Sequence, residues 1–301
     1  MADRTPSPPE WTIPADLPLL PSRRRESTKY DHGRVVVVAG SRGMAGAAAL
    51  ASMATLRSGA GLVEAVVPES IQATVAGFDP CVMTAGLAED DAGRFATAAL
   101  PVIQERCLKA DAVAVGPGLG RSEALVEIVA ELWRTLPVPV VVDADGLWAL
   151  SQLGHQARAD HAGLRVLTPH AGELQRLLGE VPSRTAAADR ATLEAAATAL
   201  ARYIGCVVVL KGPGTLVTDG ARQVHNETGN PGMATAGTGD VLTGVIAALL
   251  AQGMERFDAA RLGTCVHGAA GDVAASEVGE VSLTAADLLA GLGRGWSFQM
   301  D

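Results

Sequence analysis

The chain has 301 residues, of which 48% are hydrophobic and only 3% aromatic, and its formal net charge at pH 7 is −9. That charge argues against a general nucleic-acid or anionic-membrane surface, because such partners usually require a basic patch or stripe. With so few aromatic rings, the core must consist of Val, Leu, Ile and Ala, which is typical of a buried parallel sheet.

Residues 1–26 are expected to form a flexible or extended lead-in, because prolines recur along them and a basic run follows at residues 23–25. They contain no apolar stretch long enough for a signal peptide, and the later apolar run at 241–250 is too short to span a bilayer. The cysteines form no C-x-x-C pair, so they are expected to be reduced and mostly in the core. We expect a cytoplasmic protein with no membrane partner, in which residues 27–301 form a single domain.

Short runs rich in β-branched residues alternate with Ala- and Leu-rich stretches of helical length. The expected strands, buried on both faces, span residues 34–38, 62–67, 112–115, 138–142, 164–167 and 207–210. The expected helices span residues 46–58, 123–136, 171–178 and 184–204. Repeated units of this kind predict an α/β fold, a mainly parallel central sheet flanked by helices on both faces.

The alternation is interrupted after residue 210. Residues 214–217 and 223–225 flank an Asp-Gly pair that suits a tight turn, so they predict a hairpin. The chain beyond the hairpin is expected to be helical to its end. Thr284 and Asp287 fit a capping box for the last helix, and Gly253 can close the helix that begins near Gly239.

Two glycine clusters follow the expected strands at 34–38 and 112–115. The first covers residues 40–47 and ends on Ala47, and the second covers residues 116–120 around Gly118. Neither fits G-x-G-x-x-G, so an NAD-binding Rossmann fingerprint is rejected. Each cluster either shapes the substrate side of a pocket or is a tight turn without a ligand.

Polar side chains follow the next two strands. Asp143 and Asp145 either hold a substrate or organise their loop. His170 and Glu173 could both face the crevice, where His170 would offer hydrogen bonds to a substrate and Glu173 would act through water or Mg²⁺. The alternative is that Glu173 only favours a helix N-terminus and His170 is a satisfied turn residue.

The run KGPGT at residues 211–215 ends the strand at 207–210. Ligand sites in open α/β sheets lie beyond the carboxyl ends of strands, so Lys211 and Thr215 are placed to meet the phosphates or ribose of a nucleotide. An ordinary Gly-Pro turn with a solvated lysine is the alternative. No G-x-x-x-x-G-K-[ST] run is present, which argues against a P-loop enzyme.

The most informative stretch is GNPGMATAGTGD at residues 229–240, which runs directly into an apolar helix. Gly237 and Gly239 let backbone N–H groups converge on an anion, and the helix N-terminus adds partial positive charge. A carboxylate beside bound phosphate is costly without a task, so we expect Asp240 to be the catalytic base that accepts the proton of an attacking hydroxyl. The alternative is that Asp240 only caps the helix.

In their order and spacing over residues 27–296, these motifs resemble the ADP-dependent NAD(P)H-hydrate dehydratases. The run at 229–240 is the most specific, because sugar kinases share only its G-x-G-D ending. The resemblance implies a ribokinase-like fold and a lyase that converts the S epimer of NADHX or NADPHX to NADH or NADPH. ADP would give AMP and phosphate in this reaction, and Mg²⁺ is implied.

The resemblance also implies roles for individual residues. Asp240 would deprotonate the substrate hydroxyl, and phosphorylation of that hydroxyl would turn it into a good leaving group. The substrate would contact Ala47, Gly118, His170 and Asp240. The nucleotide would contact Lys211, Gly212, Pro213, Gly214, Thr215, Gly237, Thr238 and Gly239. The resemblance does not assign the Mg²⁺ ligands, and Glu173 is the one candidate ligand.

The chain departs from the family at two places. Many members carry His-Lys-Gly before the first strand, where this chain has Thr28-Lys29-Tyr30. Many bacterial relatives carry an N-terminal epimerase domain that this chain is too short to contain, so we expect epimerisation to be spontaneous or the work of a separate epimerase.

Three questions stay open from sequence. The same cradle and base would serve a ribokinase-like kinase of a small alcohol, such as a hydroxymethyl-pyrimidine or thiazole, and a nucleotide sensor that lost catalysis would keep the fold. The motifs do not distinguish ADP from ATP. Because an Ala-rich chain can present apolar helices to its own copies, we expect a homo-oligomer, with a tetramer as the suggested size.

Overall fold

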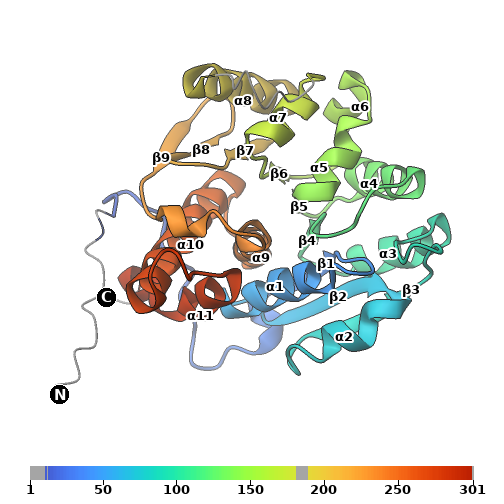
Figure 1. Cartoon of the computed structure of the whole chain (residues 1–301), viewed down its shortest axis with the longest axis horizontal. Coiled ribbons are helices and arrows are strands. Elements are labelled where there is room, and N and C mark those ends of the chain that lie inside the picture. The colour runs from blue at the N-terminus through green and yellow to red at the C-terminus, as the bar shows by residue number, and fades with distance from the viewer. Residues whose placement is uncertain (1–10, 12, 181–188, 300–301) are drawn as a thin grey trace.

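The computed structural model describes residues 11, 13–180 and 189–299. Over these residues, nine strands form one sheet in the order β3-β2-β1-β4-β5-β6-β7-β8-β9 (Figure 1). The strands are β1 Arg34–Val38, β2 Leu62–Pro68, β3 Met83–Leu87, β4 Ala112–Val115, β5 Val140–Val142, β6 Arg165–Leu167, β7 Val207–Leu210, β8 Thr215–Thr218 and β9 Gln223–Asn226.

Helices cover both faces of this sheet (Figure 1). They are α1 Ala45–Arg57, α2 Gln72–Ala76, α3 Leu100–Cys107, α4 Glu123–Thr135, α5 Ala144–Ser151, α6 His155–Ala159, α7 Ala171–Leu177, α8 Arg190–Ile204, α9 Thr238–Ala251, α10 Arg256–Val278 and α11 Ala285–Gly295. The pairings from β3 through β7 are parallel, and β8 and β9 add an antiparallel hairpin. The expected fold class is therefore confirmed.

The central strand β1 shows why the sheet is buried on both sides. Val35 and Val37 pack into a cluster with α1, α9, α10 and α11, whereas Val36 and Val38 pack into a second cluster with α4, α5, α7 and α8. All four side chains are fully buried. Successive residues of a strand point to opposite faces, so a continuous valine run suits this three-layer arrangement.

Most of the expected elements are present, with shifted ends. The expected strands at 138–142 and 164–167 are shorter than predicted, because β5 begins at Val140 and β6 at Arg165. Strand β3 was not predicted. The expected helix at 184–204 is observed as α8, capped by Asp189, and residues 184–188 lie outside the described residues.

The C-terminal helices end as the sequence predicts. Thr284 and Asp287 form the capping box of α11. Gly253 has φ +88° and donates its N–H to the Leu250 carbonyl at 3.0 Å, which closes α9. The four cysteine thiols are free, and all but Cys81 are buried, as expected. In the part of the chain that the structure covers, no helix is both long and apolar enough to cross a bilayer.

Helix α9 is held tightly against α1. A Cβ at Gly244 would lie 2.2 Å from the Ala51 carbonyl oxygen, so only glycine permits this approach. Because the strands from β1 to β7 are parallel, their carboxyl ends share one edge of the sheet. The N-terminus of α9 reaches the same edge, which brings the separate sequence motifs together.

Candidate active site

Lys211 is the centre of the polar cluster at this edge. It follows β7, and its Nζ donates to Asp143 Oδ1 at 2.7 Å and lies 3.8 Å from Glu173 Oε2. Asp143 follows β5 and Glu173 lies in α7 after β6, so three neighbouring strands supply the group. Burial disfavours the charge on Lys211, but the two carboxylates outweigh that effect and raise its pKa. Lys211 is therefore a partly buried cation at neutral pH.

Asp143 is fixed on both sides. Its Oδ2 accepts a 2.8 Å hydrogen bond from Thr243 Oγ1 in α9, and the residue is almost fully buried. A Cβ at Gly116 would lie 1.8 Å from the Asp143 carbonyl oxygen. Ala144, which follows, has φ +48° and is the only non-glycine residue of the described chain with positive φ. Such strain persists only where the surroundings enforce it, so Asp143 is a rigid partner for Lys211.

Asp240 lies in the first turn of α9, beside this cluster. The helix is preceded by Gly237 with φ +92°. A Cβ at Gly239 would lie 3.2 Å from Lys211 Nζ, so the cradle backbone runs directly past the cation. Burial, followed by the charge of Asp143, raises the pKa of Asp240 to about 7, and Lys211 only partly opposes this shift. A carboxylate with such a pKa can exchange protons near neutral pH, as a general base requires.

A residue that the sequence did not predict makes hydrogen bonds to the predicted nucleotide loop, residues 211–215. Arg190, at the start of α8, donates to the Gly214 carbonyl at 2.9 Å. Thr215 Oγ1 donates to the Gly212 carbonyl at 2.9 Å across the turn that contains Pro213. The loop is thus a fixed turn next to Lys211. No local pattern distinguishes Arg190 from other helical arginines.

His170 caps α7. Its Nδ1 accepts hydrogen bonds from the N–H groups of Gly172 and Glu173, and Glu173 Oε2 accepts from the His170 N–H at 2.8 Å. Burial and the charge of Lys211 lower the pKa of His170, so the ring is neutral at pH 7. This capping box agrees with the alternative interpretation, in which Glu173 favours the helix N-terminus and His170 is a satisfied turn residue. Because Nδ1 is the acceptor, the proton is on Nε2, and 56% of the side chain is exposed.

The two predicted substrate contacts Ala47 and Gly118 meet each other. Gly118 has φ +61°, and a Cβ there would lie 2.9 Å from the Ala47 Cβ. One turn along α1, Leu50 packs beside the cradle, where a Cβ at Gly237 would lie 2.7 Å from Leu50 Cδ1. Helix α1 therefore lies against both glycine turns.

The other predicted contacts are linked only indirectly. Asp240 and His170 share no hydrogen bond or ion pair among the described residues, although each is within electrostatic reach of Lys211. Any ligand that contacts both residues must therefore extend across the Lys211 cluster.

Helix α10 fixes both ends of the 229–240 run. Asp272 accepts hydrogen bonds from the Gly229 N–H and from Asn230 Nδ2, both at 2.9 Å. His267 Nε2 donates to the Thr238 carbonyl at 2.8 Å, and burial lowers the pKa of His267 to about 4, so it stays neutral. Sequence reasoning missed both residues. Their signal was two polar side chains in the stretch 266–275 of α10, which otherwise consists of Gly, Ala and Val.

The donor set at Lys211 suits a hard cation. Within the described residues, no group of three or more His, Cys, Asp or Glu forms a ready-made metal site. The carboxylates of Asp143, Glu173 and Asp240 nevertheless face one cluster, and Mg²⁺ is commonly bound by one or two carboxylates together with substrate phosphates and water. The residues present therefore fit Mg²⁺ bound in that way.

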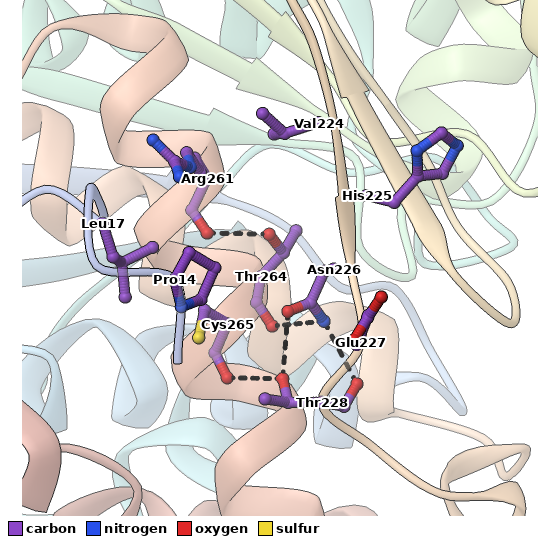
Figure 2. A pocket seen from close by; sticks show the side chains of 10 residues that line it. All are labelled: Pro14, Leu17, Val224, His225, Asn226, Glu227, Thr228, Arg261, Thr264 and Cys265. Carbon is purple, nitrogen blue, oxygen red and sulfur yellow. Dashed lines mark hydrogen bonds between the residues drawn. The ribbon is translucent and has the colours of Figure 1, made fainter. Parts of the chain in front are cut away.

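A separate cavity of about 180 Å³ lies between β9, α10 and the lead-in segment (Figure 2). Several of its polar groups are already paired with each other. Asn226 Nδ2 donates to the carbonyls of Thr228 and Thr264, and Thr228 Oγ1 donates to the Cys265 carbonyl. None of the predicted site residues lines it, so it is not the site built around Lys211.

Comparison with known proteins adds an independent finding. Residues 35–293 match the family model for NAD(P)H-hydrate dehydratase. The chain is 47% identical over 271 residues to a bifunctional NAD(P)H-hydrate repair enzyme Nnr of Moorella thermoacetica, covering 90% of this chain and 50% of that protein. The Escherichia coli enzyme of the same name is 37% identical over 276 residues, covering 91% and 50%. The chain thus spans about half the length of the curated relatives it matches.

Solved structures agree with the fold. An ADP/ATP-dependent NAD(P)H-hydrate dehydratase from Bacillus subtilis, co-crystallised with ATP/Mg²⁺, has a TM-score of 0.77 and 28% identity, covering 93% of this chain and 95% of that chain. A hydroxyethylthiazole kinase from Pyrococcus horikoshii has a TM-score of 0.58 at 17% identity, covering 88% and 89%, which supports the ribokinase-like fold alone.

Proposed function

The chain belongs to the NAD(P)H-hydrate dehydratase family, as its motifs indicated, and from that premise we propose that it dehydrates (6S)-NADHX and (6S)-NADPHX to NADH and NADPH, with ADP as phosphoryl donor. Residues 27–301 would act as a single domain that follows the lead-in at 1–26. The observation that carries the proposal is Asp240, whose pKa is raised to about 7 at the N-terminus of α9, beside the glycine cradle and Lys211.

The first step is phosphoryl transfer. Asp240 accepts the proton of the substrate hydroxyl while that oxygen attacks the terminal phosphorus of ADP, and the bond from phosphorus to the AMP oxygen breaks. Backbone N–H groups of Gly237, Thr238 and Gly239 and the Lys211 cation stabilise the charge on the transferring group. Bound Mg²⁺ would neutralise phosphate charge, with Glu173 supplying a carboxylate through water.

The second step is elimination. The carbon–oxygen bond breaks, and phosphate leaves with the electron pair of that bond. The ring nitrogen supplies electrons, and the neighbouring ring carbon releases a proton to water, which restores the double bond of the dihydropyridine. Hydroxide would be a poor leaving group at the same carbon, so the phosphoryl donor is consumed to make the departure easy.

Product analysis tests this function. Purified protein is incubated with NADHX, Mg²⁺ and either ADP or ATP, and nucleotides and phosphate are separated by chromatography. The proposal predicts one AMP and one phosphate for each NADH formed from ADP, with no stable phosphorylated intermediate. An accumulating phosphorylated alcohol would instead favour a small-alcohol kinase. The variant Asp219→Asn is a matched control for Asp240→Asn, since Asp219 lies in the turn of the β8–β9 hairpin.

We also propose that the protein works in the cytoplasm as a homo-oligomer, with a tetramer as the suggested size. A separate epimerase would supply the S epimer of the substrate. Light scattering that shows only monomer would contradict the oligomer.

A further inference from the structure

A second cavity, of about 220 Å³, opens beside His170. Residues that follow β4, β5 and β6 line it, including Arg121, Trp148 and Arg176. Glu173, which interacts with Lys211, lines the cavity as well, so the cavity adjoins the active site on the side of α7.

Two guanidinium groups face this space. Arg121 lies over the Trp148 ring, 5.5 Å from its centroid, and its Nε is 3.3 Å from Asp145 Oδ1. Arg176, in α7, is half-buried and makes no side-chain hydrogen bond or ion pair with any residue that the structure describes. The Arg176 charge still reaches the site, because it adds to the effects of burial and Lys211 on His170.

The carboxylates in the same cavity already have other partners. Asp145 Oδ2 accepts the Gly120 N–H at 2.8 Å. Glu173 Oε2 accepts the His170 N–H at 2.8 Å. Backbone N–H groups therefore satisfy one oxygen of each carboxylate. Asp145 also contacts Arg121 through its other oxygen, whereas no hydrogen bond or ion pair joins Arg176 to either carboxylate. In a chain with a net charge of −9, a pocket that combines two guanidinium groups with an aromatic ring therefore favours an anionic, ring-bearing ligand.

We propose that this cavity is a phosphate subsite that holds the dinucleotide tail of the substrate through Arg121 and Arg176. The proposal rests on the proposed function, in which the hydrated ring lies at Asp240 and the phosphates of ADP lie at Lys211. The tail of the substrate must then leave the cluster on another side, and the cavity beside His170 offers that path. Its phosphate is either the diphosphate bridge common to NADHX and NADPHX or the 2′-phosphate found only in NADPHX.

The test measures equilibrium binding of NADH and NADPH, the products that carry the same tails, by the fluorescence of their reduced ring. Arg176→Gln is expected to weaken binding about 10-fold or more, the effect of losing one charge-assisted hydrogen bond. Equal weakening for both products identifies the diphosphate, and weakening confined to NADPH identifies the 2′-phosphate. Unchanged affinity for both, or no binding by the unmodified protein, would overturn the subsite.

Three further variants keep the result interpretable. Arg176→Lys retains the charge but loses the planar fork, so it should bind between the unmodified protein and Arg176→Gln. Arg121→Gln should weaken binding independently if Arg176→Gln fails to fold. Arg134→Gln is the control, because Arg134 lies near the far end of α4 in a surface ion pair with Glu131 and should leave affinity unchanged.

Kinetics separate this subsite from the proposed function. In Arg176→Gln, KM for the hydrated dinucleotide should rise about 10-fold or more, while kcat and KM for ADP stay the same. If the unmodified protein binds NADPH through Arg176 but never converts NADHX, the proposed function fails and the subsite stands. If it converts both NADHX and NADPHX, and the KM for each is the same in both proteins, only the subsite fails.

Discussion

Replacing Asp240 by asparagine should stabilise the protein while abolishing its activity. In the folded protein the pKa of Asp240 rises from 3.8 to about 7, first because of burial and then because of Asp143. The native state therefore holds this proton more tightly than the unfolded chain. Burying this carboxyl group therefore costs no folding stability well below pH 4, where it is protonated in both states. The cost increases between about pH 4 and pH 7 and is complete above about pH 7, where the carboxylate is ionised in both states.

The size of the effect follows from the shift. About three pKa units, at about 1.4 kcal/mol each, correspond to about 4 kcal/mol. Because the side chain is only partly buried, solvent screening reduces this figure, and we expect Asp240→Asn to gain about 1–3 kcal/mol at about pH 8.

Urea unfolding of both proteins at about pH 5 and about pH 8 measures this gain. The difference in free energy of unfolding between variant and unmodified protein should be clearly larger at the higher pH. Comparing the two pH values isolates the charge, because any change in hydrogen bonding on substitution is common to both. A difference that is independent of pH, or a variant less stable at about pH 8, would refute the reasoning.

Other substitutions probe the neighbouring parts of the site. Lys211→Met should lower kcat/KM for ADP by about 100-fold or more. It should also destabilise the fold by about 3 kcal/mol, because Asp143 is left buried without its partner. Normal kinetics and stability in this variant would contradict both expectations. In Gly239→Ala, the new Cβ would be 3.2 Å from Lys211 Nζ, the end of a long side chain that can shift by a few tenths of an ångström, so activity should fall about 10-fold with little change in unfolding. In Gly244→Ala, the Cβ would be 2.2 Å from the Ala51 carbonyl oxygen, so urea unfolding should show a loss of about 3 kcal/mol. Similar stability losses in the two glycine variants would be inconsistent with the geometry.

Sequence patterns were sufficient for the layers of the fold and for the position of the motifs. The valine run of β1 is buried on both faces, as a continuous β-branched run predicts. Because the strands are parallel, every motif that follows a strand lies at one edge of the sheet. The placement of Lys211 and His170 near each other follows from that rule alone. Asp240 joins them because α9 packs back against β4 and β5.

Local patterns could not supply the pairing within the site. The ion pair between Asp143 and Lys211 joins residues 68 positions apart and depends on β6 lying between β5 and β7, which is a property of strand order. Strand β3 was missed because its sequence, MTAGL, contains only one β-branched residue. It is the outermost strand of the sheet, and most of its residues are partly exposed. The high pKa of Asp240 could not be predicted from the sequence either, since it arises from burial and from the carboxylate of Asp143, which follows β5.

The most direct test of the account is the absorbance of the reduced nicotinamide ring after the protein is mixed with NADHX, Mg²⁺ and either ADP or ATP. We expect a nucleotide-dependent rise in absorbance. Its rate should increase with pH through about 7, as Asp240 ionises, and the rise should be absent in Asp240→Asn. No rise with either nucleotide from folded protein, or an undiminished rise in Asp240→Asn, would contradict the account.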